Sequence, residues 1–217
     1  MSFDSHGAIS LIKNMAKVVA ENEEYLNELD SGIGDAEHGL NLKRGFDAVM
    51  GRIESLEGKP PHEVIKEVGT TLASAGCGTG PTFYGLAMRS AARVLAKKGT
   101  DSPEAIAESL EAALRAIKEK GGAEVGSKTM VDALEPAVTA FKKRAEVGGS
   151  VLEAFDDAVE AARSGMEATR DMIGKKGRGY HAGERGLGHQ DPGATSTYLL
   201  LKCIRDTVAE LCPSKTN

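Results

Sequence analysis

Residues 152–166 read LEAFDDAVEAARSGM, and the apolar side chains in this stretch recur at alternating three- and four-residue steps. One face of a helix would therefore carry Leu152, Phe155, Val159, Ala162 and Met166, while most of the charged side chains occupy the other face. The spacing predicts an amphipathic helix whose apolar face packs against a core.

Outward from this stretch, the same spacing returns along most of the chain. No segment shows the strict alternation of apolar and polar residues that predicts a half-buried strand. The sequence therefore predicts an all-α fold of about eight amphipathic helices. The segments concerned are 8–29, 42–56, 61–75, 81–98, 103–117, 129–144, 152–166 and 194–211.

Length and composition indicate one globular domain that spans residues 1–217. No apolar run is long enough to cross a membrane, and the N-terminus lacks the features of a signal peptide, so we expect a cytoplasmic protein without membrane attachment. A net charge of −5 and the absence of tryptophan argue against nucleic acid as a partner. Cys77, Cys203 and Cys212 form no Cys-x-x-Cys pair, which predicts reduced thiols and no zinc site.

The connections between the predicted helices differ in composition. Four are rich in glycine and polar side chains, and they alternate with short, plain links around Gly58, Gly99 and Gly148. If neighbouring helices run antiparallel, all four rich connections lie at the same end of the bundle, which is the expected place for binding or catalysis. The four rich connections are 30–37, 76–80, 121–128 and 174–193.

The first rich connection holds three carboxylates within eight residues, Asp30, Asp35 and Glu37. Two glycines between them allow a tight turn that brings the acids together. Carboxylates without nearby thiolates suit magnesium, which takes few protein ligands and keeps water or phosphate oxygens. The alternative is a solvated acidic turn, in which Asp30 ends one helix and Glu37 favours the N-terminal dipole of the next.

The second rich connection contains three glycines and leads to Pro81, which we expect at the first position of the next helix. Free backbone N–H groups and the positive end of the helix dipole would then form an anion cradle. A plain helix–helix turn is the alternative, although such a turn needs only one glycine.

The third rich connection looks like a Walker-type phosphate loop, but Lys128 is one residue out of register and the segment follows a helix instead of a strand. We therefore reject a phosphate loop of that type. Met130, just after it, suits either core packing, which the periodicity favours, or the face of an adenine ring.

The fourth rich connection, 174–193, is long, basic and glycine-rich. We expect it to form an ordered cover over phosphates, with Arg178 able to make a bidentate contact. A mobile basic linker is the alternative. No serine or cysteine lies in a nucleophile context, so we expect no covalent catalysis by this chain.

Four motifs in these connections together resemble the nucleotide-binding L subunit of dihydroxyacetone kinases. They occur in the expected order and extend from the first helix to the last. The motifs are Asp30-x-x-x-Gly34-Asp35-x-Glu37-His38-Gly39-x-Asn41, Thr79-Gly80-Pro81, Lys128-Thr129-Met130 and Gly188-His189-Gln190-Asp191-Pro192-Gly193-Ala194-Thr195-Ser196.

The resemblance implies a closed up-and-down barrel of eight antiparallel helices that binds two Mg²⁺ ions and ADP or ATP at the loop-rich end. It implies that Asp30, Asp35 and Glu37 hold the metals and that Arg178 acts catalytically. Glu37 departs from the family, which usually has aspartate there, and its extra methylene changes the geometry open to the second metal. The other implied nucleotide contacts surround the phosphates and ribose (His38, Asn41, Thr79, Gly80), flank the adenine (Gly121, Met130) or close the site (Arg178, Asp191, Gly193).

The same resemblance implies a kinase subunit that is not active alone. A separate K subunit would hold the ketose, dihydroxyacetone by default, and a phosphoenolpyruvate-linked M subunit would recharge ADP that stays bound as a coenzyme. The alternatives are the branch in which ATP exchanges, another ketose such as erythrulose, a nucleotide-sensing regulatory module, and a helical scaffold with solvated acidic loops. The oligomeric state stays open, a homodimer included.

Overall fold

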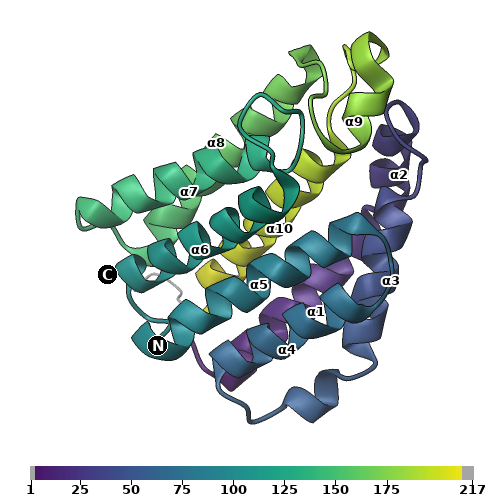
Figure 1. Ribbon diagram of the computed structural model, residues 1–217. Helices are drawn as coiled ribbons and strands as arrows, with labels where there is room; N and C mark the ends of the chain where they lie inside the picture. The colour runs from purple at the N-terminus through teal and green to yellow at the C-terminus, as the bar shows by residue number, and fades with distance from the viewer. Residues whose placement is uncertain (1–2, 212–217) are drawn as a thin grey trace.

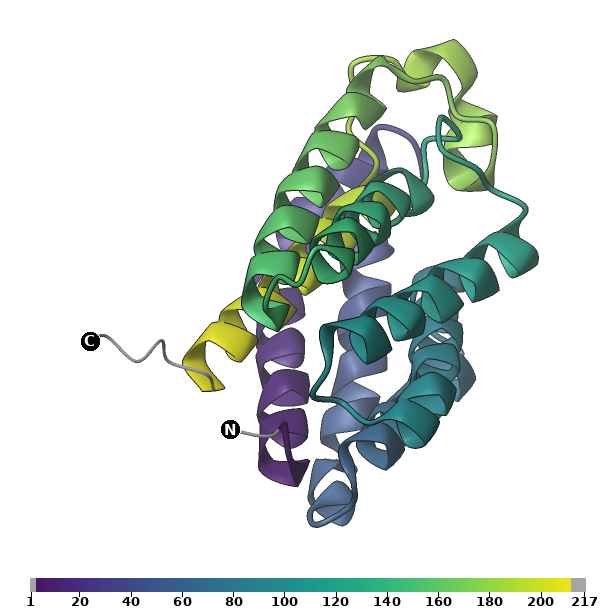
Figure 2. The ribbon, with the colours of Figure 1, turned by 90° about the vertical axis from the view of Figure 1, so that its left-hand side faces the viewer.

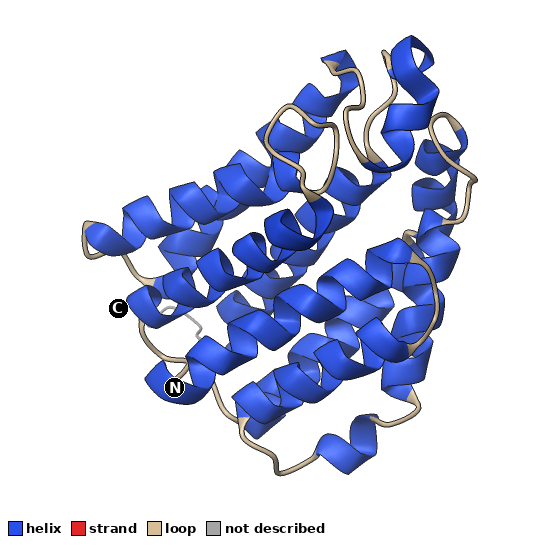
Figure 3. Cartoon of the chain, viewed as in Figure 1, coloured by secondary structure: helices blue, strands red, loops and turns tan. Residues whose placement is uncertain are grey.

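The computed structural model describes residues 3–211, and this part of the chain forms helices joined by connections, with no strand (Figure 3). The prediction of an all-α fold is confirmed. The α-helices of this part are α1 (Ser5–Glu21), α2 (Glu23–Ser31), α3 (His38–Met50), α4 (Pro61–Ser74), α5 (Thr79–Lys98), α6 (Pro103–Gly121), α7 (Val131–Glu146), α8 (Val151–Ala168), α9 (Gly177–Ala182) and α10 (Pro192–Leu211). Three short 3₁₀-helices join them, η1 (Ile53–Leu56), η2 (Thr169–Asp171) and η3 (Gly183–Gly186).

The long helices close into a ring (Figures 1 and 2). Helix α1 contacts α3, and the ring continues through α4, α5, α6, α7 and α8 to α10, which packs against α1 again. Connections between ring neighbours reverse the direction of the chain, so the arrangement is the expected up-and-down barrel. Helices α2 and α9 are not part of the ring, and both lie at one end of it.

Three parts of the chain differ from the prediction. The segment 8–29 divides into two helices at Asn22, whose Nδ2 donates to the Val18 carbonyl at 2.8 Å and so shares this acceptor with its own backbone N–H, 3.2 Å away. The segment 42–56 is also divided, since α3 ends before Gly51 and η1 follows. In the fourth connection, α9 and η3 form where the glycine-rich composition predicts a loop.

Apolar side chains of the barrel form two clusters. One joins α6, α7, α8 and α10 around Phe141 and Phe155, whose rings meet edge to face with centroids 4.8 Å apart. The other joins α1, α3, α4 and α10 around Leu42 and Phe46. Each such side chain contributes roughly 1.5–3 kcal/mol when fully buried. A cavity of about 300 Å³, lined mainly by apolar side chains of both clusters, lies between them inside the barrel.

The two ends of the barrel differ in chemistry. At one end, α6 and α8 begin with ordinary serine caps, and Ser150 and Glu153 form a reciprocal capping box at α8. The other end, towards the upper right of Figure 1, carries the four rich connections. The prediction that these connections lie at the same end is confirmed, because the alternating helices of an up-and-down barrel return the chain there.

No helix within residues 3–211 is both long enough and apolar enough to cross a membrane. Cys77 and Cys203 are free thiols, as predicted, and burial raises the pKa of the Cys203 thiol to about 11. Cys212 lies outside the described residues.

Candidate functional site

A pocket of about 180 Å³ lies where the four rich connections meet. Residues from all four line it, so their predicted convergence is confirmed. Asp35, Glu37 and Asn41 do not line this pocket, although the turn and helix that carry them border it. The predicted site residues in the lining are Asp30, His38, Thr79, Gly80, Gly121, Met130, Arg178, Asp191 and Gly193.

Asp30 lies in the last turn of α2, where the acidic turn that leads to α3 begins. It is only 2% exposed, and its Oδ2 accepts a hydrogen bond from Glu37 N at 3.0 Å. The backbone N–H of Gly34 donates to the carbonyl oxygen of Asp30 at 2.5 Å, and a Cβ at Gly34 would come within 2.1 Å of Asp30 Oδ1. Only glycine fits at that position, so the turn can close around the carboxylate.

Asp35 lies in the same turn and forms an ion pair with Arg178 of α9. Burial raises the pKa of Asp30, and the adjacent Asp35 carboxyl adds to this effect. For Asp35, burial also acts upward, but hydrogen bonds with Asp30 and Arg178 outweigh it and lower the pKa. The turn therefore holds two carboxyl groups in contact, a pair that a cation stabilises.

This acid pair fits magnesium in ligand type, because Asp30 and Asp35 supply carboxylate oxygens in a turn without thiolates. Glu37 reaches the pair through its backbone N–H, whereas the residue itself is exposed. Within residues 3–211, no group of three or more His, Cys, Asp or Glu side chains is arranged to hold a metal ion. The structure thus brings together two of the three predicted ligands, and the Glu37 carboxylate is not joined to them.

The second connection presents the N-terminus of α5 to the pocket. The helix begins at Thr79, so Pro81 is its third residue and not its first, contrary to the prediction. Gly78, just before the helix, has a φ of 88°, a left-handed conformation that favours glycine. The first turn contains no acidic residue and no side-chain cap, so its N–H groups and positive dipole suit an anion.

His38 and Asn41, from the first turn of α3, pack against this N-terminus. A Cβ at Gly80 would lie 3.3 Å from His38 Cε1, and a Cβ at Gly78 would lie 3.1 Å from Asn41 Nδ2. The His38 Nε2 atom is 2.9 Å from Ser196 Oγ of α10. Three helices therefore meet at the place where the resemblance implies phosphate and ribose contacts.

A chain of hydroxyl groups holds His38 in place. Ser196 Oγ is 2.7 Å from Tyr84 OH, which is 2.9 Å from Thr197 Oγ1. Burial, helped by the positive charge of Arg178, lowers the pKa of His38 to about 4, so the imidazole is neutral at neutral pH. Neither Tyr84 nor Ser196 is among the residues predicted for the site. Ser196 belongs to the last motif, whereas Tyr84 has no signal in the sequence beyond its place on a predicted helix.

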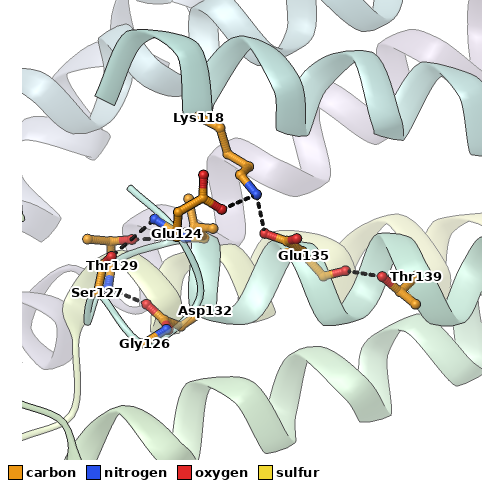
Figure 4. Close-up of polar contacts among 9 residues, drawn as sticks. Lys118, Glu124, Gly126, Ser127, Thr129, Asp132, Glu135 and Thr139 are labelled. Atoms are coloured by element: carbon orange, nitrogen blue, oxygen red, sulfur yellow. Dashed lines mark hydrogen bonds and ion pairs between the residues drawn. The ribbon is translucent and has the colours of Figure 1, made fainter. Parts of the chain in front are cut away.

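The third connection is fixed by side chains of both flanking helices (Figure 4). Asp132 Oδ1 of α7 accepts a hydrogen bond from Gly126 N at 2.5 Å. Lys118 of α6 forms ion pairs with Glu124 in the connection and with Glu135 of α7. Because both helices hold it, the connection forms a defined wall of the pocket.

Gly121 and Met130 lie at the two ends of this connection, and both line the pocket. A Cβ at Gly121 would lie 3.2 Å from the Phe83 ring, and a Cβ at Gly193 would lie 3.6 Å from Met130 Cβ. Met130 belongs to the core, as its periodicity predicts, and also contributes to the pocket wall. Phe83 supplies the aromatic surface beside Gly121 and is not among the predicted site residues.

We define the lid as residues 170–188, the segment between Thr169 and His189 that contains α9 and η3. Arg178 lies on α9, one residue after its start, and reaches the acidic turn. The backbone N–H of Gly188 donates to the carbonyl oxygen of Arg170 at 2.8 Å, which closes the lid at its base. The segment thus has its own helices and closing bonds, as an ordered cover requires.

Asp191 follows the lid and caps α10. Its Oδ2 accepts a hydrogen bond from Ala194 N at 2.7 Å, and its backbone N–H donates to Thr169 Oγ1 at 2.9 Å. Burial raises the pKa of the Asp191 carboxyl to about 7. The side chain is therefore a buried structural group at the pocket wall, next to Gly193.

The model of the DAK2 domain family matches residues 32–206. The ADP-binding subunit DhaL of PEP-dependent dihydroxyacetone kinase 1 from Listeria innocua is 32% identical over 207 residues, which cover 95% of this chain and 98% of that protein. The ADP-binding subunit DhaL of PEP-dependent dihydroxyacetone kinase from Escherichia coli is 33% identical over 205 residues, which cover 94% of this chain and 97% of that protein.

Among solved structures, the dihydroxyacetone kinase of C. freundii in complex with AMP-PNP and Mg²⁺ is similar to this chain with a TM-score of 0.70. The sequences are 23% identical, and the match covers 92% of this chain and 33% of that chain. At this identity the likeness shows a shared fold, and the helical barrel therefore corresponds to about one third of that larger protein.

Proposed function

We propose that this chain, which belongs to the DAK2 domain family, is the nucleotide-binding subunit of a dihydroxyacetone-type kinase. It would hold ADP or ATP and present a phosphoryl group to a small ketose bound by a separate K subunit. The observation that carries the proposal is the pocket at the loop-rich end, where an acid pair, a helix N-terminus and an arginine meet. Two relatives that match this chain over nearly their full length are ADP-binding kinase subunits.

The acid pair is the proposed metal site. Asp30 and Asp35 would bind Mg²⁺ directly, and Glu37 would complete the ligand set after its side chain turns towards them. Bound magnesium neutralises phosphate charge and orients the phosphates for transfer. We propose two metal ions, because the acidic motif resembles that of the L subunits of dihydroxyacetone kinases.

The remaining pocket residues would bind the nucleotide itself. Thr79 and Gly80 offer backbone N–H groups at the start of α5, which suits phosphate oxygens. His38, held neutral, and Asn41 would add hydrogen bonds without adding charge. At the other end of the pocket, Gly121 and Met130 would take the adenine, while Asp191 and Gly193 close the wall between the two ends.

Arg178 is the proposed catalytic residue. Its guanidinium already lies at the acidic turn, so it would neutralise charge that develops on the transferred phosphoryl group. Positioning and charge neutralisation are the main requirements of phosphoryl transfer, and no covalent intermediate on this chain is needed. This placement favours transfer over an ADP-sensing role, which would not require a cation at that point.

The rim of the pocket suits a protein partner. Exposed large apolar side chains are uncommon in the described part of the chain, and most of them surround the loop-rich end. We propose that a K subunit docks on this rim, that a phosphoenolpyruvate-linked M subunit recharges bound ADP, and that the complex works in the cytoplasm. The exposed apolar residues at the rim are Tyr25, Val125, Ile173, Tyr180 and Leu187.

The test is to purify the chain with magnesium, denature it, and identify any nucleotide that is released, with a chelator-treated sample in parallel. Retained ADP that the chelator removes is the result expected for a bound coenzyme. An empty protein that binds ATP only with magnesium would favour the exchanging branch. A protein that binds no nucleotide under either condition would overturn the proposed function.

A further inference from the structure

Lys128 is among the largest fully buried side chains of the described residues, with 1% of its surface exposed. A buried ammonium group is unfavourable unless its N–H donors find partners. The backbone φ of Lys128 is 60°, a left-handed value that is uncommon for residues other than glycine. The surrounding structure therefore holds this lysine in a costly position.

The ammonium group joins the two ends of the lid. Its Nζ donates hydrogen bonds to the carbonyl oxygen of Thr169 at 2.6 Å and to that of His189 at 2.5 Å. These residues directly precede and follow the lid. One side chain thus holds both points at which this 19-residue segment leaves and re-enters the barrel.

The methylene stem of Lys128 lies under the lid. A Cβ at Gly179 of α9 would be 3.7 Å from Lys128 Cδ, and a Cβ at Gly186 of η3 would be 3.7 Å from Lys128 Cε. Both helical parts of the lid therefore lie against the same stem. The backbone N–H of Lys175 adds a further link to this loop, since it donates to the Ser127 carbonyl at 3.0 Å.

The loop that carries Lys128 is itself anchored. Asp132 Oδ2 accepts a hydrogen bond from Thr129 N at 2.7 Å, and the other oxygen of the same carboxylate holds Gly126. These bonds hold the backbone on both sides of Lys128 to α7, so the ammonium group cannot easily shift relative to that helix. The lid is thus connected through Lys128 to a fixed point of the barrel.

We propose that Lys128 is a positioning residue, which fixes the lid over the pocket and through it the place of Arg178. Arg178 immediately precedes Gly179, which lies on the Lys128 stem, so a displaced stem displaces the guanidinium. The lysine that makes this loop look like a Walker motif therefore acts on two backbone carbonyls, and not on phosphates. The catalytic part of this inference rests on the proposed function, while the part that concerns the lid does not.

The first test measures amide hydrogen exchange in the ligand-free protein. Lys128→Met keeps most of the stem and removes the ammonium group, and Lys142→Met, an exposed lysine of α7 that pairs with Glu111, is the control. We expect exchange in the lid to become at least about tenfold faster in Lys128→Met alone, with α4 and α8 unchanged. Unchanged exchange in the lid would overturn the inference.

The second test is a double-mutant cycle on turnover with the ketose-binding partner. If Lys128 acts through Arg178, the double variant Lys128→Met/Arg178→Gln is no slower than the slower single variant. Losses that multiply would overturn the positioning role, because a lysine that only stabilises the fold acts independently of Arg178. The temperature is chosen so that every variant is fully folded, and far-ultraviolet circular dichroism checks this.

Failure of the proposed function and failure of the Lys128→Met variant to fold can each be distinguished from failure of this inference. If wild-type protein binds no nucleotide, the proposed function fails, and the exchange experiment still decides whether Lys128 holds the lid. If Lys128→Met does not fold, Lys128→Gln takes its place, since the glutamine amide can still donate to one of the two carbonyls. We then expect lid exchange faster than in wild type, and wild-type exchange rates would count against the inference.

Discussion

The Arg178 guanidinium forms an ion pair with the Asp35 carboxylate, so a positive group of the protein itself is bound to a predicted magnesium ligand. The two residues are 143 positions apart in the sequence, and the lid brings them together. Since Asp35 also contacts Asp30, the ion pair lowers the repulsion within the acid pair. A metal that binds Asp35 must therefore compete with Arg178.

This competition predicts that Arg178→Gln strengthens magnesium binding in the absence of nucleotide. Because exposed ion pairs contribute about 0.2–1 kcal/mol, we expect an increase in affinity of roughly 1.4- to fivefold. Titration with Mn²⁺ as a spectroscopic substitute measures the change. Arg185→Gln, on the same lid, is the control and leaves the affinity unchanged, and an unchanged affinity in Arg178→Gln would contradict the competition.

In turnover with the proposed K subunit, loss of the Arg178 guanidinium acts in the opposite direction. Arg178→Ala is expected to lower the rate more than it weakens ADP binding, because the guanidinium interacts most with charge that develops during transfer. Rates at saturating substrates and ADP titrations are compared on the same preparation. A larger loss of ADP affinity than of rate would make Arg178 a binding residue only.

Asp35→Asn is expected to weaken magnesium-dependent ADP binding by more than about tenfold, because an amide keeps the shape of the side chain but loses the metal-binding charge. Calorimetric titration with and without magnesium measures this, and circular dichroism checks that the helices persist. Asp47→Asn, which removes an exposed carboxylate from α3, is the matched control. Normal ADP affinity in a folded Asp35→Asn protein would show that Asp35 is not a metal ligand.

The buried Asp191 carboxyl makes the stability of the fold depend on pH. Burial raises its pKa to about 7, whereas an unfolded chain has a value of about 3.9. Between these values the unfolded state loses the proton and the folded state keeps it. The stability that the neutral carboxyl provides is therefore complete below about pH 4 and is lost as the pH rises towards 7.

Asp191→Asn does not titrate, and its side-chain oxygen can still accept the bond from Ala194 N. We expect its free energy of unfolding, relative to wild type, to increase on the order of 1–3 kcal/mol between pH 5 and pH 7.5. Urea unfolding at the two pH values and constant ionic strength measures the difference. A relative stability that stays constant or falls with pH would show that Asp191 is ionised in the folded protein.

The sequence predicts the barrel well because every ring helix must bury one face, and burial imposes a spacing that can be counted. It fails where a single polar side chain changes the backbone, as at Asn22, whose side chain competes for a helical carbonyl. It also fails in the lid, where short helices pack against Lys128 although their own glycine-rich sequence does not favour a helix.

The sequence also predicts only part of the candidate site. Chemistry-bearing residues in loops, such as Asp30 and Arg178, stand out because connections are otherwise plain. Tyr84 and Phe83 do not, since an aromatic residue on an amphipathic helix is equally well explained by the core. Lys128 is the extreme case, because lysine is almost never fully buried and no pattern in the sequence indicates that its donors meet two carbonyls.

A chain of hydroxyl groups, from Ser196, Tyr84 and Thr197, lies behind His38. Tyr84→Phe removes the hydroxyl that lies between Ser196 and Thr197, and leaves part of their hydrogen-bonding capacity unmet in a buried place. We expect a loss of about 1–3 kcal/mol in the free energy of unfolding, measured by urea denaturation. Tyr198→Phe removes a hydroxyl from a partly buried tyrosine of α10 and is the control.

Tyr84→Phe is also expected to weaken ADP binding under conditions in which it is fully folded. Ser196, released from Tyr84, can rotate away from the His38 ring, and the imidazole then loses the contact that orients it at the start of α5. Ser196→Ala, which removes that contact directly, should weaken ADP binding to a similar extent. If both variants bind ADP like wild type, His38 does not need this chain of hydroxyl groups, and its place is set by packing against Gly80 alone.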